Sequence, residues 1–253
     1  MKNIDKLKKE FAEMDANDIV SMFETDCSRC ASDVKTCEIN CREGNLRWLS
    51  QNTKPDCKIV TWSGGTIKEI RDMINAARDG KIDLSDYWHI GDKRTFGLSE
   101  HTEVTLVLVD RNPGEYEFAV AFEDCPFIAR VNQTDTNKGG YAKSRMKQLV
   151  DDYYKTWEYR DILSSIDGLR LPTEYQVFGE NIYSDAEEGQ RQFEYYKDRA
   201  NRQKKFEGNH CWWWTASPCS GGSNFFCVVD DSGNAGYGNA SVTFGVAPFG
   251  CII

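Results

Sequence analysis

The chain has 253 residues, a net charge of −9 and a hydrophobic fraction of 40%, values typical of a globular protein with one large domain and room for a small module. No basic stripe of the kind that binds nucleic acid is visible, and the acidic balance argues against acidic membranes. No apolar run reaches the roughly 18 residues of a transmembrane helix, and the N-terminus lacks the apolar core of a secretory signal. We therefore expect synthesis in the cytoplasm, no nucleic-acid partner and no membrane insertion.

Residues 1–57 are predicted to form a small helical, cysteine-rich module. Apolar residues repeat at helical spacing over 2–24, and two heptads are too few for a coiled coil, so this helix is expected to pack on its own domain. Four clustered thiols then form the ligand set of a structural zinc site: Cys27, Cys30, Cys37 and Cys41. Disulfides or free thiols are the alternative.

Residues 58–253 are predicted to mix helices with antiparallel strands, which is the α+β class. A capping box at Thr66 and Glu69 predicts a helix that ends at Gly80. Its expected buried face is Ile67, Ile70, Ile74 and Ala77. Strands at Val104–Val109 and Tyr116–Phe122 flank an Asn-Pro-Gly turn and are expected to pair as a hairpin.

The remaining elements follow from the same criteria. A strand and turn are expected at Tyr87–Gly91. Helices are expected at 141–154, 156–166, 171–179 and 188–205, and strands at 212–214, 225–230 and 246–253.

No catalytic motif emerges from the sequence. The three histidines, His89, His101 and His210, form no metal-binding pair, and there is no nucleophile elbow, phosphate loop or dinucleotide fingerprint. Cys211 follows His210, but adjacent side chains rarely point at the same atom. We therefore expect a protein that is not an enzyme.

The last stretch of the chain has an unusual composition. Between Thr215 and Ile253 there is no Lys, Glu, Gln, Met or Trp, whereas residues 1–214 hold 54 of these five types, which predicts about ten in the tail. Turn-rich β structure accounts for part of this depletion. The missing types are also those that codons ending in C or T cannot encode.

Several landmarks occur in a recognisable order between Trp62 and Ile253. They are Asp83–Asp92 (DLSDYWHIGD), Thr136–Tyr141 (TNKGGY), Leu171–Glu174 (LPTE), Phe178–Gly179, Trp213–Pro218 (WWTASP) and Gly245–Ile252 (GVAPFGCI). In this order they resemble phage and prophage proteins with a C-type-lectin-like domain, among them the variable proteins of diversity-generating retroelements. Ala216 departs from the family pattern, which commonly has Arg at that place.

The resemblance implies a C-type-lectin-like fold, in which a short antiparallel sheet supports a surface made of C-terminal strands and loops. It also implies a receptor-binding or surface-display protein, expected in a phage tail. In such systems a reverse transcriptase mutagenises template adenines, and AAC codons treated in this way reach every amino acid except the five types missing here.

The C-terminal face, about 212–253, is accordingly expected to bind a protein or glycan on a host or target surface, with a homo-oligomer left open. Small or apolar supports are expected at Ser217, Pro218, Cys227, Val229, Gly233, Ala235, Ala240, Ser241 and Gly245. Changeable ligand-binding positions are expected at Thr215, Ala216, Cys219, Ser220, Gly221, Gly222, Asn224, Phe225, Val228, Asp230, Gly236, Tyr237, Gly238, Asn239, Val242 and Phe244. Paratopes use similar residues, since aromatic rings give contact area at low entropic cost.

Three further interpretations stay open. A cysteine oxidase of the formylglycine-generating type shares the lectin-like architecture and needs two cysteines within reach in a cleft. Asp230, Asp231 and Asn234 offer hard oxygens to calcium, although no carbohydrate-binding triplet such as Glu-Pro-Asn is present. An ordinary turn-rich region over a tryptophan core, with Trp212–Trp214 mostly buried, needs no ligand.

Overall fold

The computed structural model describes residues 57–97, 103–113, 115–163, 168–186 and 191–252. The predicted helix over 2–24 and the cysteine cluster that follows it lie outside these ranges. The described chain forms two compact units, one from 57–60 and 66–86, the other from 61–65 and 87 onward. No helix in these ranges is both long and apolar enough to cross a membrane.

The first unit contains helix α4 (Ile67–Arg78) and the short 3-10 helix η2 (Leu84–Asp86). The predicted capping box is confirmed, because Thr66 Oγ1 accepts from the Glu69 amide and Glu69 Oε2 accepts from the Thr66 amide. The buried side chains of α4 are Ile70, Met73, Ile74 and Ala76, whereas Ile67 and Ala77 are only half-buried.

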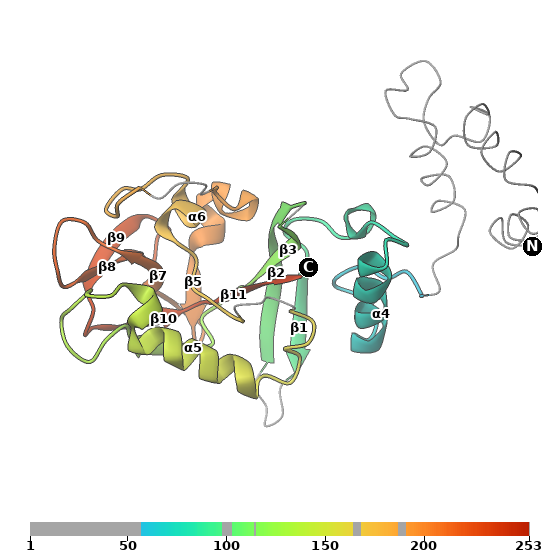
Figure 1. Ribbon diagram of the computed structural model, residues 1–253, viewed down its shortest axis with the longest axis horizontal. Coiled ribbons are helices and arrows are strands. Elements are labelled where there is room, and N and C mark those ends of the chain that lie inside the picture. Colours follow the sequence, from blue (N-terminus) through green and yellow to red (C-terminus); the bar gives the residue numbers. More distant parts are fainter. Residues whose placement is uncertain (1–56, 98–102, 114, 164–167, 187–190, 253) are drawn as a thin grey trace, which may run out of the picture. The chain divides into compact units, whose positions relative to one another are not determined.

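The first sheet of the second unit is antiparallel and has the order β1-β2-β3-β11 (Figure 1). Its strands are β1 (Lys93–Gly97), β2 (Glu103–Asn112), β3 (Tyr116–Phe122) and β11 (Phe249–Ile252). The predicted β2–β3 hairpin is confirmed. Strand β1 was not predicted, and Tyr87–Gly91 holds a turn but no strand.

The second sheet carries most of the C-terminal segment and has the order β4-β10-β7-β8-β9. Its strands are β4 (Phe127–Arg130), β10 (Thr243–Val246), β7 (Trp213–Pro218), β8 (Phe225–Val229) and β9 (Ala235–Asn239). The β10–β7 pair is parallel and the others are antiparallel. A separate hairpin joins β5 (Lys204–Phe206) to β6 (Asn209–Cys211).

Two predicted helices of the second unit are confirmed in shortened form. Helix α5 (Arg145–Thr156) begins after Ser144, whose hydroxyl accepts from the Lys147 amide, and the short 3-10 helix η3 (Tyr141–Lys143) precedes it. Helix α6 (Glu174–Phe178) ends at Gly179, which has a left-handed backbone with φ of 78°.

Two other helix predictions are wrong. Residues 158–162 form turns, because Trp157 adopts an extended backbone and its ring packs in the interior near Phe96 and Phe122. The described part of 188–205 forms two 3-10 helices, η4 (Glu194–Lys197) and η5 (Arg199–Arg202), instead of one α-helix.

The core joins the inner faces of both sheets. Val107, Ala119 and Phe249 of the first sheet pack in one cluster with Trp213 and Val229 of the second. Of the three consecutive tryptophans, Trp213 and Trp214 are fully buried and Trp212 is 39% exposed. This confirms the prediction that the three rings lie mostly in the core and do not all point the same way.

Candidate functional site

The sixteen predicted ligand-binding positions separate into an accessible group and a buried group. Thirteen are exposed or half-buried: Ala216, Ser220, Gly221, Gly222, Asn224, Phe225, Asp230, Gly236, Tyr237, Gly238, Asn239, Val242 and Phe244. The other three are buried, which corrects their assignment to a surface: Thr215, Cys219 and Val228. Of the nine predicted supports, six are buried: Ser217, Cys227, Val229, Gly233, Ala240 and Gly245. Burial therefore follows the predicted division at most positions.

The three buried positions have partners inside the protein. Thr215 Oγ1 donates to the Cys227 carbonyl at 2.9 Å, and Cys219 Sγ lies 3.5 Å from Cys227 Sγ. Val228 is opposite Trp214 in the β7–β8 register and is fully buried. Changes at these positions are therefore expected to alter packing and stability, not a contact surface.

The β8–β9 register places the candidate positions on two opposite faces. Phe225 pairs with Asn239, and Val228 pairs with Gly236. Since successive side chains of a strand alternate, Phe225 and Val228 point in opposite directions. Phe225 and Val228 therefore do not share one exposed face of β8, although both were predicted to bind ligand.

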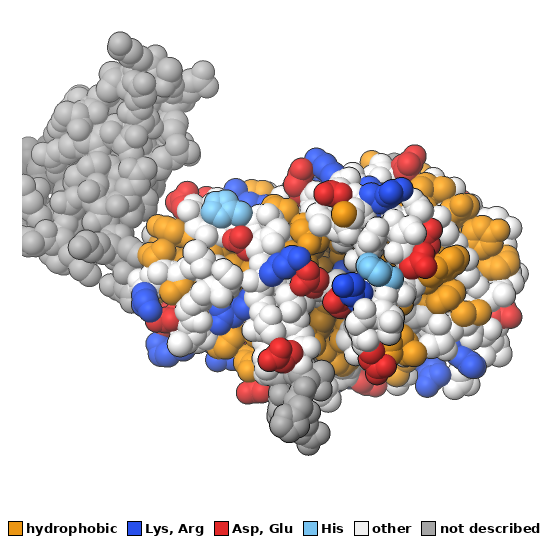
Figure 2. Space-filling view, turned by 180° about the vertical axis from the view of Figure 1, so that it is seen from behind, with side chains coloured by type: hydrophobic (Ala, Val, Ile, Leu, Met, Phe, Trp, Pro, Cys, Tyr) orange, Lys and Arg blue, Asp and Glu red, His pale blue; other side chains and the backbone are white. Residues whose placement is uncertain are grey.

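One group of candidates forms a contiguous surface, which we call the rim patch: Ser220, Gly221, Gly222, Asn224, Phe225, Tyr237 and Asn239. The Tyr237 ring packs edge-on against Phe225 and against Tyr183, with both centroid distances 5.2 Å. Asn224 Nδ2 donates to Asn239 Oδ1 at 2.9 Å. Tyr237 remains 52% exposed, and Figure 2 shows hydrophobic side chains gathered at this end of the molecule.

The loop of the rim patch is held by a side chain from a distant segment. Asn137 Nδ2 donates to the carbonyl oxygens of Cys219 (3.2 Å), Gly222 (2.6 Å) and Phe225 (3.2 Å). The backbone amide of Asn137 also donates to the Ser223 carbonyl at 2.8 Å. Because these acceptors are backbone atoms, the bonds place no demand on the loop's own side chains.

A second anchor comes from helix α6. The carboxylate of Glu174 is fully buried and accepts hydrogen bonds from the Tyr183 amide, the Ser184 amide and the Ser184 hydroxyl. Ser220 in turn donates through its amide and its hydroxyl to the Tyr183 carbonyl. The buried carboxylate thus positions the segment on which the rim patch rests.

The opposite face of the sheet carries other aromatic rings. Phe244 packs against Trp214 and Trp212, with centroid distances of 4.9 and 5.5 Å. A Cβ atom at Gly238 would lie 2.6 Å from the Phe244 ring, so this position is fixed by packing. Trp212 and Phe244 border a groove of about 540 Å³, which the β5–β6 hairpin also lines.

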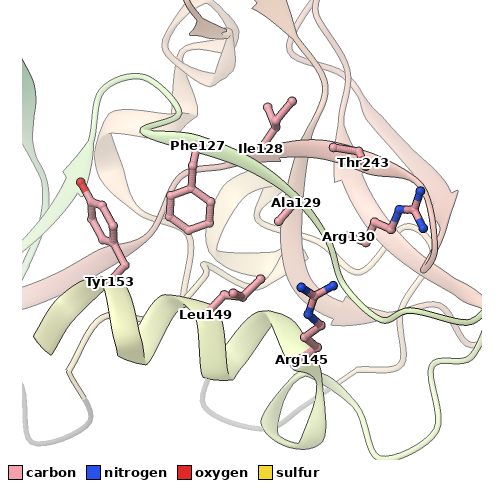
Figure 3. Close-up of a pocket in the computed structure, with 8 residues that line it drawn as sticks. All are labelled: Phe127, Ile128, Ala129, Arg130, Arg145, Leu149, Tyr153 and Thr243. Carbon is pink, nitrogen blue, oxygen red and sulfur yellow. The ribbon is translucent and has the colours of Figure 1, made fainter. Parts of the chain in front are cut away.

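A further groove of about 500 Å³ lies between helix α5 and strand β4 (Figure 3). Phe127 and Leu149 point toward one another across it, and Arg130 and Arg145 lie at one end. None of the sixteen candidate positions lines this groove. It is therefore separate from the rim patch.

The Asp230 carboxylate, a possible calcium ligand, accepts hydrogen bonds within its own turn. Asp230 Oδ1 accepts from the amides of Ser232 (2.9 Å) and Asn234 (2.7 Å), and Asp230 Oδ2 accepts from Asn234 Nδ2. Across the part of the chain that the structure describes, no group of three metal-ligating side chains comes together. The turn therefore explains Asp230 without a metal.

The oxidase interpretation needs two cysteines within reach in a cleft, and the C-terminal segment offers Cys211, Cys219, Cys227 and Cys251. The structure brings Cys219 and Cys227 together, and both are buried. Their hydrogen bond raises the pKa of Cys227 and lowers that of Cys219. The more accessible Cys211 instead lies near Cys125, which the sequence did not suggest as a partner.

Comparison with known proteins adds one finding. A family described as DUF6273, a domain of unknown function, matches residues 163–252. This segment contains α6, β5 to β11 and all sixteen candidate positions, but it omits β1 to β4 and α5. No curated protein and no solved structure matches the chain.

Several residues of the site were missed from the sequence. Asn137 and Glu174 lie within quoted landmarks, but nothing near them in sequence shows that Asn137 holds a loop more than 80 residues away, or that the Glu174 carboxylate holds Tyr183 and Ser184. The Cys125–Cys211 pair joins residues 86 positions apart. For Tyr183, an aromatic residue in a polar segment is the only local signal.

Proposed function

We propose that this protein is a non-enzymatic ligand-binding protein with a C-type-lectin-like fold, and that its ligand contacts the rim patch. The resemblance implies an antiparallel sheet that supports C-terminal strands and loops. The mixed α+β architecture is compatible with that arrangement, since β11 returns to the first sheet while β7 to β9 carry the accessible positions.

The observation that carries this proposal is the way in which the rim patch is held. Its loop is fixed through backbone carbonyls by Asn137, and its neighbouring segment is fixed by Glu174. Neither anchor lies in the segment with the unusual composition. Side chains of the rim patch can therefore change while the loop keeps its shape, which is the property that a diversified binding surface requires.

Diversification by a retroelement is the second part of the proposal. The missing Lys, Glu, Gln, Met and Trp are the types that adenine-mutagenised AAC codons cannot produce. Sibling genes are then expected to differ mainly at the rim patch, beside a template repeat and a reverse transcriptase gene. Sequencing the gene neighbourhood tests this, and sibling differences spread evenly along the gene would contradict it without affecting ligand binding.

The ligand is proposed to be a protein or a glycan on a target surface, and the protein to act as a phage receptor-binding protein. Tyr183, Phe225 and Tyr237 offer ring faces and edges that stack on sugar rings or on apolar side chains. The cysteine-rich segment before residue 58 is proposed to bind structural zinc. Its metal content can be measured directly on purified protein.

The binding test uses the full chain on glycan and protein arrays. Binding partners found with the wild type are then measured with Tyr237→Ala and Phe225→Ala. Tyr87→Ala is the matched control, since Tyr87 is half-buried and far along the chain from the rim patch. We expect a loss of at least tenfold in affinity for both rim-patch variants and none for the control. Equal affinity of all four proteins would contradict the proposed surface.

A further inference from the structure

The thiols of Cys125 and Cys211 lie close together outside the rim patch. Cys125 lies between β3 and β4, and Cys211 ends β6, yet their sulfur atoms are 3.8 Å apart. The Cys125 amide donates to the Lys205 carbonyl at 2.8 Å, and Lys204 pairs with Cys211 in the hairpin register. Backbone bonds therefore hold both cysteines in place.

The neighbouring strand leaves space for the two sulfur atoms. A Cβ atom at Gly245 of β10 would lie 2.5 Å from Cys125 Sγ and 3.0 Å from Cys211 Sγ. Any other residue at this position would force the sulfurs to move. Glycine at 245 thus accommodates the pair.

The two thiols differ in access and in chemistry. Cys125 is only 5% exposed, whereas Cys211 is half-buried and lines the 540 Å³ groove. The hydrogen bond between them lowers the pKa of Cys211, with a further contribution from the nearby Lys204 ammonium, and it raises the pKa of Cys125 together with burial. A thiol that is accessible and more easily ionised reacts first, because the thiolate is the nucleophile.

We propose that Cys211 and Cys125 form a reversible, peroxide-driven disulfide, with Cys211 as the attacking thiol and Cys125 as the resolving thiol. The Cys211 thiolate attacks a peroxide oxygen, the O–O bond breaks, and Cys211 becomes a sulfenic acid while hydroxide leaves and takes up a proton. The Cys125 sulfur then attacks the Cys211 sulfur and displaces water. In total, two thiols and one hydrogen peroxide give one disulfide and two waters.

The second close pair of cysteines provides an internal comparison. Cys219 and Cys227 are nearer to one another, at 3.5 Å, but both are buried and neither lines either groove. If distance alone decided reactivity, this pair would oxidise first. If access decides it, Cys211 and Cys125 oxidise first.

The experiment treats the fully reduced, full-length protein with increasing hydrogen peroxide, blocks the remaining thiols and maps disulfides by mass spectrometry. No Lys or Arg follows Lys205, so trypsin alone leaves four cysteines in one peptide. Chymotrypsin, which cuts after the aromatic residues from Trp212 onward, separates Cys211 from Cys219 and Cys227. The cysteines before residue 58 fall in other peptides.

We expect the Cys125–Cys211 bridge to appear at a peroxide dose at least tenfold lower than the Cys219–Cys227 bridge, and to disappear on reduction. Cys125→Ser should leave a sulfenic acid at Cys211 that a dimedone probe labels, and Cys211→Ser should leave Cys125 unlabelled. Circular dichroism of both variants checks that they fold. Earlier oxidation of Cys219–Cys227, or a bridge from Cys211 to any other cysteine, would overturn the proposal.

Discussion

Strands β3 and β9 are both short and both lie in antiparallel pairs, yet they depend on different parts of the chain. Six of the seven residues of β3 are buried, and its own apolar side chains fill the core. No residue of β9 is buried, and two of its five residues are glycine. The loops beside β9 are held by Asn137 and Glu174, which lie elsewhere in sequence. Burial of its own side chains therefore holds β3 in place. Strand β9 is held by neighbouring segments instead, so its side chains need not pack in the core.

The largest effect on stability is expected at Glu174, the buried anchor of the segment beside the rim patch. Glu174→Ala removes the acceptor of three hydrogen bonds from Tyr183 and Ser184. Leaving these half-buried donors without a partner, beside the cavity left by the buried carboxylate, should lower the free energy of unfolding by about 3 kcal/mol. Urea denaturation measures this, with the exposed Glu180→Ala as control. A loss equal to that of the control would show that the rim patch does not depend on this carboxylate.

Glycine substitutions distinguish the two faces of the β8–β9 region. Gly238→Ala places a Cβ 2.6 Å from Phe244 and 3.3 Å from Trp214, whereas Gly221→Ala meets no atom within 4 Å. We expect a loss of about 2 kcal/mol for Gly238→Ala from overpacking and less than about 0.5 kcal/mol for Gly221→Ala. Thermal denaturation compares them. Equal effects would mean that both faces tolerate change alike.

The role of the distant amide is tested by Asn137→Ala. Three loop carbonyls lose their donor, which should cost about 1–2 kcal/mol, since these carbonyls can recover water only in part. Hydrogen exchange should speed up in residues 219–225 and stay unchanged in β3. Asn209→Ala, an exposed amide on β6, is the control. Unchanged exchange in the loop would remove Asn137 as its anchor.

A smaller effect is expected in the pH dependence of stability, and it comes from Lys204 in the core. Burial lowers the pKa of Lys204 to about 8, below the unfolded value of about 10.4. The unfolded state therefore binds more protons between these values, so stability should rise with pH from 8 to 10, by about 1 kcal/mol for each pH unit. Lys204→Met should flatten this rise in urea denaturation at each pH. Identical slopes of the free energy of unfolding against pH for the wild type and Lys204→Met would contradict the lowered pKa of Lys204.

The sequence predicts features that depend on neighbours along the chain. The capping box of α4 and the β2–β3 hairpin follow from local spacing and turn residues, and both were found where predicted. The helix predicted for 188–205 fails because long-range packing of Phe193 and Tyr196 decides that segment. Asn137 and Lys204 act on residues more than 80 positions away, and no local pattern contains that information.

The lack of long-range information in local patterns also explains why the candidate surface was predicted only in part. Composition marked the segment that we propose to be changeable, but it could not separate Tyr237, which is exposed, from Val228, which is buried one strand away. Strand register and the alternation of side chains decide this. Both follow from pairing that only the folded chain reveals.

The most direct test of the central claim compares two libraries of the full chain displayed on yeast. One randomises the rim patch and the other randomises Thr215, Cys219 and Val228, with the same codons. The fraction of clones that resist protease reports folding. We predict that most rim-patch clones remain folded and that most clones of the buried set do not. Equal folded fractions in the two libraries would contradict a changeable surface held from outside.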